Sequence, residues 1–94
     1  MNQEKIGAFL AECRKQKNLT QEQLSEILGV SSKSVSRWEN GKTLPDYTIL
    51  DSMCNALEIS INEFYYGEKM LEQDFKPLTE QNLRLYFREE YRKR

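Results

Sequence analysis

The sequence contains no histidine, only two cysteines and no long apolar run. Without histidine, the commonest general base and the commonest neutral metal ligand are missing, which excludes Ser-His-Asp and Cys-His catalysis and histidine-bound zinc. Cys13 and Cys54 lie far apart and have no C-x-x-C partner, so they fit neither a zinc knuckle nor a disulfide-rich secreted scaffold. We therefore expect two buried, reduced thiols, no metal or other cofactor, and no enzymatic activity.

No segment approaches the ~20 apolar residues that span a bilayer, and the first five residues do not begin a secretion signal. The sequence thus predicts a soluble, cytoplasmic protein without membrane contact. Its 94 residues carry 14 basic and 15 acidic side chains, so the formal charge of −1 gives no overall attraction for nucleic acid. The charge is uneven along the chain: it is +2 for residues 1–43, −4 for 44–67 and +1 for 68–94.

Apolar spacing and capping residues predict helices and almost no strand. In the first segment, from about residue 2 to residue 17, the apolar residues recur at the i, i+3, i+4 and i+7 spacing of one helix face, and they are Ile6, Phe9, Leu10 and Cys13. Asn18 is expected to end this helix in the left-handed conformation that asparagine tolerates.

A second helix is predicted from Thr20, which can form a capping box with Gln23, to Gly29, where a positive φ ends it. It is expected to turn three apolar residues inward, which are Leu24, Ile27 and Leu28. Ser31 can cap a third helix that runs to about Asn40 and ends at Gly41.

Two further capping signals follow. Asp46 can cap a fourth helix, on which apolar residues again follow helical spacing, and Ser60 with Glu63 forms a second capping box for a short fifth helix that ends at Gly67. The sequence therefore predicts an all-α, compact five-helix domain over residues 1–67, followed by a C-terminal extension over residues 68–94.

The stretch from Gln21 to Asn40 is the most informative, because two short helices joined by a turn at Gly29 must cross steeply, as in a helix-turn-helix. Ser25 is small enough to permit a close crossing. On the third predicted helix, Val35 and Trp38 share one face and are expected to be buried.

The opposite face of that helix carries small hydroxyls and long cations, which suit the major groove of DNA. Lys33 or Arg37 can donate to guanine O6 and N7, and Ser32 and Ser36 can bond to bases or phosphates. Gln21 begins the preceding helix, where free backbone N–H groups favour a phosphate.

Several motifs together resemble the Cro/C1-type (XRE-like) helix-turn-helix family over roughly residues 4–67. They are Thr20-Gln21-Glu22-Gln23-Leu24, Ile27-Leu28-Gly29-Val30-Ser31, Ser34-Val35-Ser36-Arg37-Trp38-Glu39-Asn40-Gly41 and Leu44-Pro45. The family often has alanine where this chain has Ser25, and serine still permits the crossing.

The resemblance implies a five-helix, lambda-repressor-like domain that binds operator DNA, usually as a homodimer, with the third helix in the major groove. Carried over by position, the residues expected near bases or the adjoining backbone are Gln21, Ser32, Lys33 and Arg37. Those expected to hold phosphates are Ser31, Asn40, Lys42 and Thr43, together with Gln21. Arg14 and Glu39 resemble the family's structural ion pair.

Two functions from different classes remain open on the sequence. The first is a sequence-specific, double-stranded DNA-binding transcriptional regulator, expected to be a repressor. The second is a protein-interaction or antitoxin-like adaptor that uses the same fold, which the net negative charge and the unexplained C-terminal extension motivate.

The extension has three interpretations: a dimerisation helix, a linker to a further region, or a disordered end. Thr79 can cap a last helix with a partial apolar stripe of Leu83, Tyr86, Phe87 and Tyr91, and these aromatic residues argue against complete disorder. The basic end at Arg92-Lys93-Arg94 suggests that the native chain continues.

Overall fold

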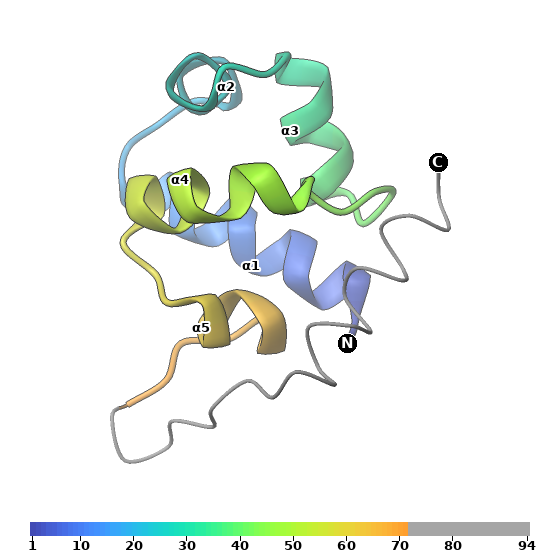
Figure 1. The fold of residues 1–94 in the computed structure, drawn as a ribbon, viewed down its shortest axis with the longest axis vertical. Helices are drawn as coiled ribbons and strands as arrows, with labels where there is room; N and C mark the ends of the chain where they lie inside the picture. Colours follow the sequence, from blue (N-terminus) through green and yellow to red (C-terminus); the bar gives the residue numbers. More distant parts are fainter. Residues whose placement is uncertain (72–94) are drawn as a thin grey trace.

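The computed structural model describes residues 1–71, and this part of the chain folds into five α-helices (Figure 1). They are α1 (Gln3–Gln16), α2 (Gln21–Leu28), α3 (Ser32–Glu39), α4 (Tyr47–Leu57) and α5 (Ile61–Tyr66). The predicted all-α, five-helix architecture is confirmed for these residues. No helix in the described range is long and apolar enough to cross a membrane. The predicted helix after Thr79 lies outside the described residues.

The helices begin where side-chain oxygens satisfy their first N–H groups. Thr20 Oγ1 accepts from the backbone N of Gln23 at 3.0 Å, and Gln23 Oε1 accepts from the backbone N of Thr20 at 2.9 Å. Ser31 caps α3 by accepting from the backbone N of Ser34, and Asp46 caps α4 by accepting from the backbone N of Thr48. Local sequence chemistry therefore decides where these helices start.

The helix ends follow the expected conformations. Asn18, after α1, has φ 57°, and Gly29, after α2, has φ 71°. In the left-handed region, the backbone can turn out of the helix and let its N–H groups bond the last carbonyls. The backbone N of Val30, for example, donates to Ser25 O at 3.0 Å.

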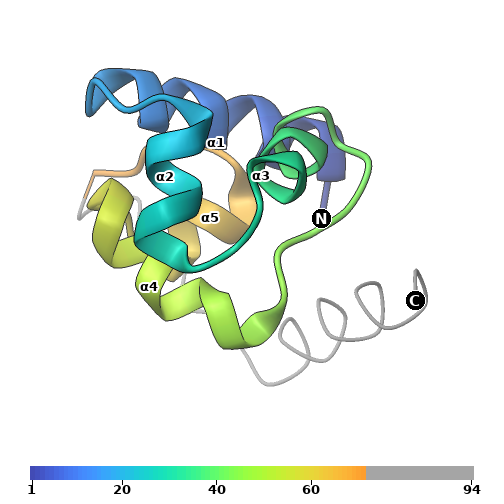
Figure 2. The same cartoon turned by 90° about the horizontal axis from the view of Figure 1, so that it is seen from above.

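The helix pair α2 and α3 forms one end of the molecule, and α5 forms the other (Figures 1 and 2). In Figure 1 α2 is seen nearly end-on while α3 runs along the picture, and in Figure 2 the two exchange these views, so their axes cross steeply. Ser25 is buried on α2 and donates its hydroxyl to Glu22 O at 2.6 Å, so its polar atom is satisfied within the helix.

One core joins all five helices. Its members come from every helix, for example Ile6 of α1, Leu24 of α2, Val35 of α3, Met53 of α4 and Phe64 of α5. Both cysteines are buried free thiols, as expected. Because α3 packs on both α1 and α2, its orientation is set by two neighbours rather than by the turn alone.

One predicted core residue is not in the core. Ile27 is 57% exposed, whereas Leu24 and Leu28 are buried. At 100° per residue, the buried face of α2 is centred between Leu24, Ser25 and Leu28, and Ile27 lies about 100° away from that centre. The prediction counted apolar residues and did not allow the buried serine to rotate the inward face away from Ile27.

The approach of α1 to α3 depends on Gly7. A Cβ built at this position would lie 2.3 Å from Trp38 O and 2.8 Å from Glu39 O. The backbone of α1 therefore contacts the last turn of α3 with no room for a side chain. This contact holds the end of α3 against α1.

Candidate nucleic-acid interface

Packing of one face of α3 leaves the other face to solvent. Val35 has no exposed surface and Trp38 is 7% exposed, so both lie in the core as predicted. Ser32, Lys33 and Arg37 are exposed on the outer side. Ser36 is half-buried, and its hydroxyl accepts from Asn40 Nδ2 at 3.3 Å. The predicted base-contacting residues of α3 therefore lie on one short, rigid helix.

Three cations surround this face. Lys33 and Arg37 lie on α3, and Lys42 lies just beyond its end; all three are exposed. None of them forms an ion pair with any acidic side chain in the described part of the chain. Their charge is thus not neutralised within residues 1–71, although the whole chain carries a net charge of −1.

Beneath the same helix, Arg14 and Glu39 form a buried ion pair. Arg14 Nε donates to Glu39 Oε2 at 2.7 Å and Nη2 donates to Oε1 at 3.1 Å, with side-chain exposures of 11% and 6%. The remaining guanidinium nitrogen, Nη1, donates to Leu19 O at 2.7 Å. The hydrogen bond to Glu39 raises the pKa of Arg14, although burial acts in the opposite direction.

Glu39 also positions the side chain of Gln21. Gln21 Nε2 donates to Glu39 Oε1 at 3.0 Å. An amide nitrogen has two hydrogens, so this bond orients the Gln21 side chain and leaves the second hydrogen able to donate elsewhere. One carboxylate therefore connects α1, α2 and α3, and Arg14 balances its charge.

The residues expected at phosphates lie around the two ends of α3. Ser31 is exposed, and its hydroxyl accepts from the backbone N of Ser34 at 3.1 Å. Asn40 is exposed and donates its amide to Ser36 O at 2.8 Å. Thr43 is half-buried on the segment that leaves the helix. Ser31 and Asn40 thus hold the two ends of α3 by hydrogen bonds.

Two features of this site were not found from the sequence. The Gln21–Glu39 hydrogen bond joins residues on different helices and leaves no local pattern. Gly7 did leave a signal, because a glycine inside a helix costs about 1 kcal/mol relative to alanine and needs a packing reason. The predicted helix over residues 2–17 contained that glycine without explaining it.

Comparison with known proteins agrees with the helix-turn-helix arrangement of α2 and α3. A helix-turn-helix family model matches residues 10–64. The matched range contains α2, α3 and α4 completely. It therefore includes every residue of the exposed α3 face described above.

Two curated relatives and one solved structure illustrate the similarity. The transcriptional activator BcrR of Enterococcus faecalis is 40% identical over 66% of this chain and 30% of its own length. The cryptic phage CTXphi transcriptional repressor RstR of Vibrio cholerae is 42% identical over 63% of this chain and 53% of its own length. The crystal structure of the clp gene regulator ClgR from Corynebacterium glutamicum superposes with a TM-score of 0.64 at 30% identity, covering 71% of each chain. The chain thus spans 30% of the length of the first of these curated relatives and 53% of the length of the second.

Proposed function

Because the chain belongs to the Cro/C1-type helix-turn-helix family, we propose that it is a sequence-specific regulator of transcription that binds double-stranded DNA with α3 in the major groove. The observation that carries the proposal is the exposed face of α3, where Lys33 and Arg37 have no ion-pair partner among residues 1–71. An α-helix fits the major groove, and these cations can donate to guanine O6 and N7.

The remaining contacts follow from the same placement. Ser32 and Ser36 would bond to neighbouring bases, and Gln21 would use its second amide hydrogen on a base or a phosphate at the groove edge. Ser31, Asn40, Lys42 and Thr43 would contact phosphates on either side. These contacts would set the register of α3 and supply most of the salt-dependent affinity.

We further propose that the protein binds as a homodimer. An eight-residue helix brings only about three or four side chains to base edges, so one copy has limited specificity. Two copies related by a two-fold axis would bind half-sites one helical turn apart, about 34–36 Å, or a multiple of that spacing. Sedimentation of the protein with and without its DNA site would measure the stoichiometry.

The test of DNA recognition is selection of bound sequences from random duplex DNA, followed by titration of the selected site at several salt concentrations. We expect an enriched inverted repeat and an affinity that falls steeply with salt, because bound phosphates release counterions. Failure to enrich any sequence, with affinity independent of salt, would contradict the proposal and favour the protein-interaction alternative.

We propose repression as the regulatory outcome, since a small domain on a promoter can block polymerase without a further contact surface. BcrR is named an activator and RstR a repressor, so the family includes both outcomes. Transcription in vitro from a promoter that overlaps the selected site should fall as the protein is added. A rise would overturn repression and leave the DNA-binding proposal intact.

A further inference from the structure

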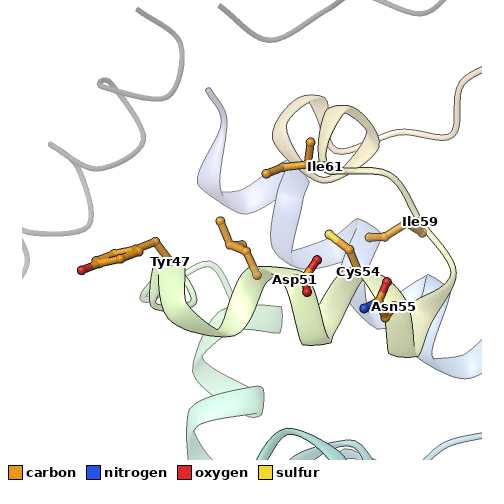
Figure 3. A pocket seen from close by; sticks show the side chains of 7 residues that line it. Tyr47, Asp51, Cys54, Asn55, Ile59 and Ile61 are labelled. Carbon is orange, nitrogen blue, oxygen red and sulfur yellow. The ribbon is translucent and has the colours of Figure 1, made fainter. Parts of the chain in front are cut away.

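A groove of about 490 Å³ lies between α4 and α5 (Figure 3). The DNA-binding proposal does not use it. Most of its lining is apolar and comes from both helices and the loop between them. These apolar lining residues are Tyr47, Leu50, Cys54, Ile59 and Ile61. Asp51 and Asn55 of α4 complete the lining.

The α4 side of the groove consists of two parallel rows. Leu50 and Cys54, four residues apart, form the buried apolar row. Tyr47, Asp51 and Asn55, also four residues apart, form the exposed row beside it. Residues spaced by four lie on one face of a helix, so apolar and polar contacts run side by side along α4.

The groove leaves apolar surface exposed and carries a negative charge. Tyr47 is 44% exposed and Ile61 is 43% exposed. Asp51 is exposed and has no hydrogen bond or ion pair within residues 1–71. Residues 44–67 contain four acidic side chains and no basic one. A complementary occupant is therefore a segment with an apolar row beside a basic row.

The sequence beyond residue 71 has this pattern. Apolar residues recur there every four positions, at Leu83, Phe87 and Tyr91. The residue after each of them is an arginine, at positions Arg84, Arg88 and Arg92. On a helix, these two sets form adjacent rows, one apolar and one cationic. Residues 84–94 carry five basic and two acidic side chains, and so have the charge opposite to that of residues 44–67.

We propose that residues 79–94 dock in the α4–α5 groove of their own chain, with the Leu83 row on the apolar floor and the arginine row facing Asp51. The described chain ends beside α5, since the backbone N of Met70 donates to Glu63 Oε2 at 2.9 Å. The seven residues from 72 to 78 can span up to about 23 Å. Helix α5 is only about 9 Å long, so a connection of seven residues is long enough to reach the groove.

Paramagnetic broadening in the full-length chain tests this docking. A nitroxide attached to Glu90→Cys should reach only the introduced thiol, because Cys13 and Cys54 are buried and burial raises the pKa of both. Unsubstituted protein treated with the same reagent should remain unlabelled. In the labelled, ¹⁵N-enriched protein, we expect the amide signals of α4 and α5 to lose most of their intensity, and those of α2, which packs on α4 but does not line the groove, to lose less.

Two controls make the result decisive. Asp51→Lys should restore most of the α4 and α5 signal, whereas Glu26→Lys, a matched exposed acid on α2, should leave the broadening unchanged. A mixture of ¹⁵N-enriched unlabelled protein with spin-labelled protein at natural isotope abundance should show no broadening. Broadening in the mixture would overturn the proposal in favour of a second copy in the groove. Absence of α4 and α5 broadening in every sample would show that the groove is not occupied by this segment.

Discussion

Arg37 lies on the exposed face of α3 with no ion-pair partner among residues 1–71, so its guanidinium can make a bidentate contact with guanine. We expect Arg37→Ala to weaken binding to the selected site by about 1–3 kcal/mol and to relax base preference at one position. Binding titrations against single-base variants of the site would measure both effects.

Lys42→Ala is the matched comparison, because we propose that Lys42 contacts a phosphate rather than a base. It should weaken binding to all sequences alike and reduce the salt slope by about one. Equal losses on every sequence for Arg37→Ala would remove Arg37 from the base-reading set. Lys15→Ala, an exposed cation on α1, should change neither quantity.

The Glu39 carboxylate accepts hydrogen bonds from both Arg14 and Gln21. Its removal leaves a guanidinium with 11% side-chain exposure and no balancing charge, so we expect Glu39→Ala to lower the free energy of unfolding by about 3–5 kcal/mol. Urea denaturation followed by Trp38 fluorescence measures this loss. A cost below about 1 kcal/mol would mean that the pair behaves like an exposed surface pair.

At the scale of elements, the α1–α3 contact is the most sensitive to a small change. Gly7→Ala should destabilise the fold by about 1–3 kcal/mol, because the new Cβ would meet two backbone carbonyls that cannot move independently. Alanine would otherwise favour the helix by about 1 kcal/mol, so an increase in stability would contradict the close contact. The midpoint temperature of thermal unfolding and the affinity for DNA should both fall, because the clash displaces the end of α3.

Gly29→Ala is a substitution whose cost in stability should come from backbone conformation and not from a steric clash, in contrast to Gly7→Ala. No atom lies within 4 Å of a Cβ built at Gly29, but its φ is 71°. Its loss of about 1–2 kcal/mol would come from the left-handed backbone alone. The position of α3 relative to α1 should then be preserved, and DNA affinity should be lowered less than by Gly7→Ala.

The start of α5 makes stability depend on acidity. Burial of Glu63 would raise its pKa, but hydrogen bonds from the backbone N–H groups of Ser60 and Met70 outweigh it and lower the pKa. A carboxyl with a lowered folded-state pKa stabilises the protein above its unfolded pKa of about 4.3, and the contribution is lost as pH falls through the folded value.

We therefore expect Glu63→Ala to cost about 1 kcal/mol at pH 7, a typical value for a lost cap, and less as the pH falls below about 4. Urea titrations of both proteins across this range measure the difference. A gap that stays constant or widens on acidification would contradict the role of the carboxylate.

At the scale of the whole molecule, a single core protects both thiols. Cys13 is 2% exposed and Cys54 is 9% exposed, and burial raises the pKa of Cys54 to about 11. In native protein we expect both to react with a disulfide reagent at one slow rate that follows global unfolding, because the five helices share one core. Mass spectrometry at increasing urea should detect doubly modified chains without a singly modified intermediate. Early modification of Cys54 alone would show that its thiol is reached from the α4–α5 groove, which it lines, without unfolding of the core.

Most of the architecture was predictable from the sequence because its signals are local. Thr20 and Asp46 begin their helices, and Gly29 ends α2, through bonds to backbone groups only a few residues away. The outward placement of Lys33 and Arg37 followed from the opposite placement of Val35 and Trp38 on an eight-residue helix. Helical periodicity was thus sufficient to separate the core face of α3 from its cationic face.

The tertiary structure alone decided how α1, α2 and α3 contact one another. Packing between helices turned α2 so that Ile27 is exposed. It also brought α1 against α3 at Gly7 and placed Gln21 within hydrogen-bonding distance of Glu39. The groove between α4 and α5 also depends on how two separate helices pack. A sequence pattern determines which face of a helix is apolar, but the space left between helices depends on the combined shape of all their side chains.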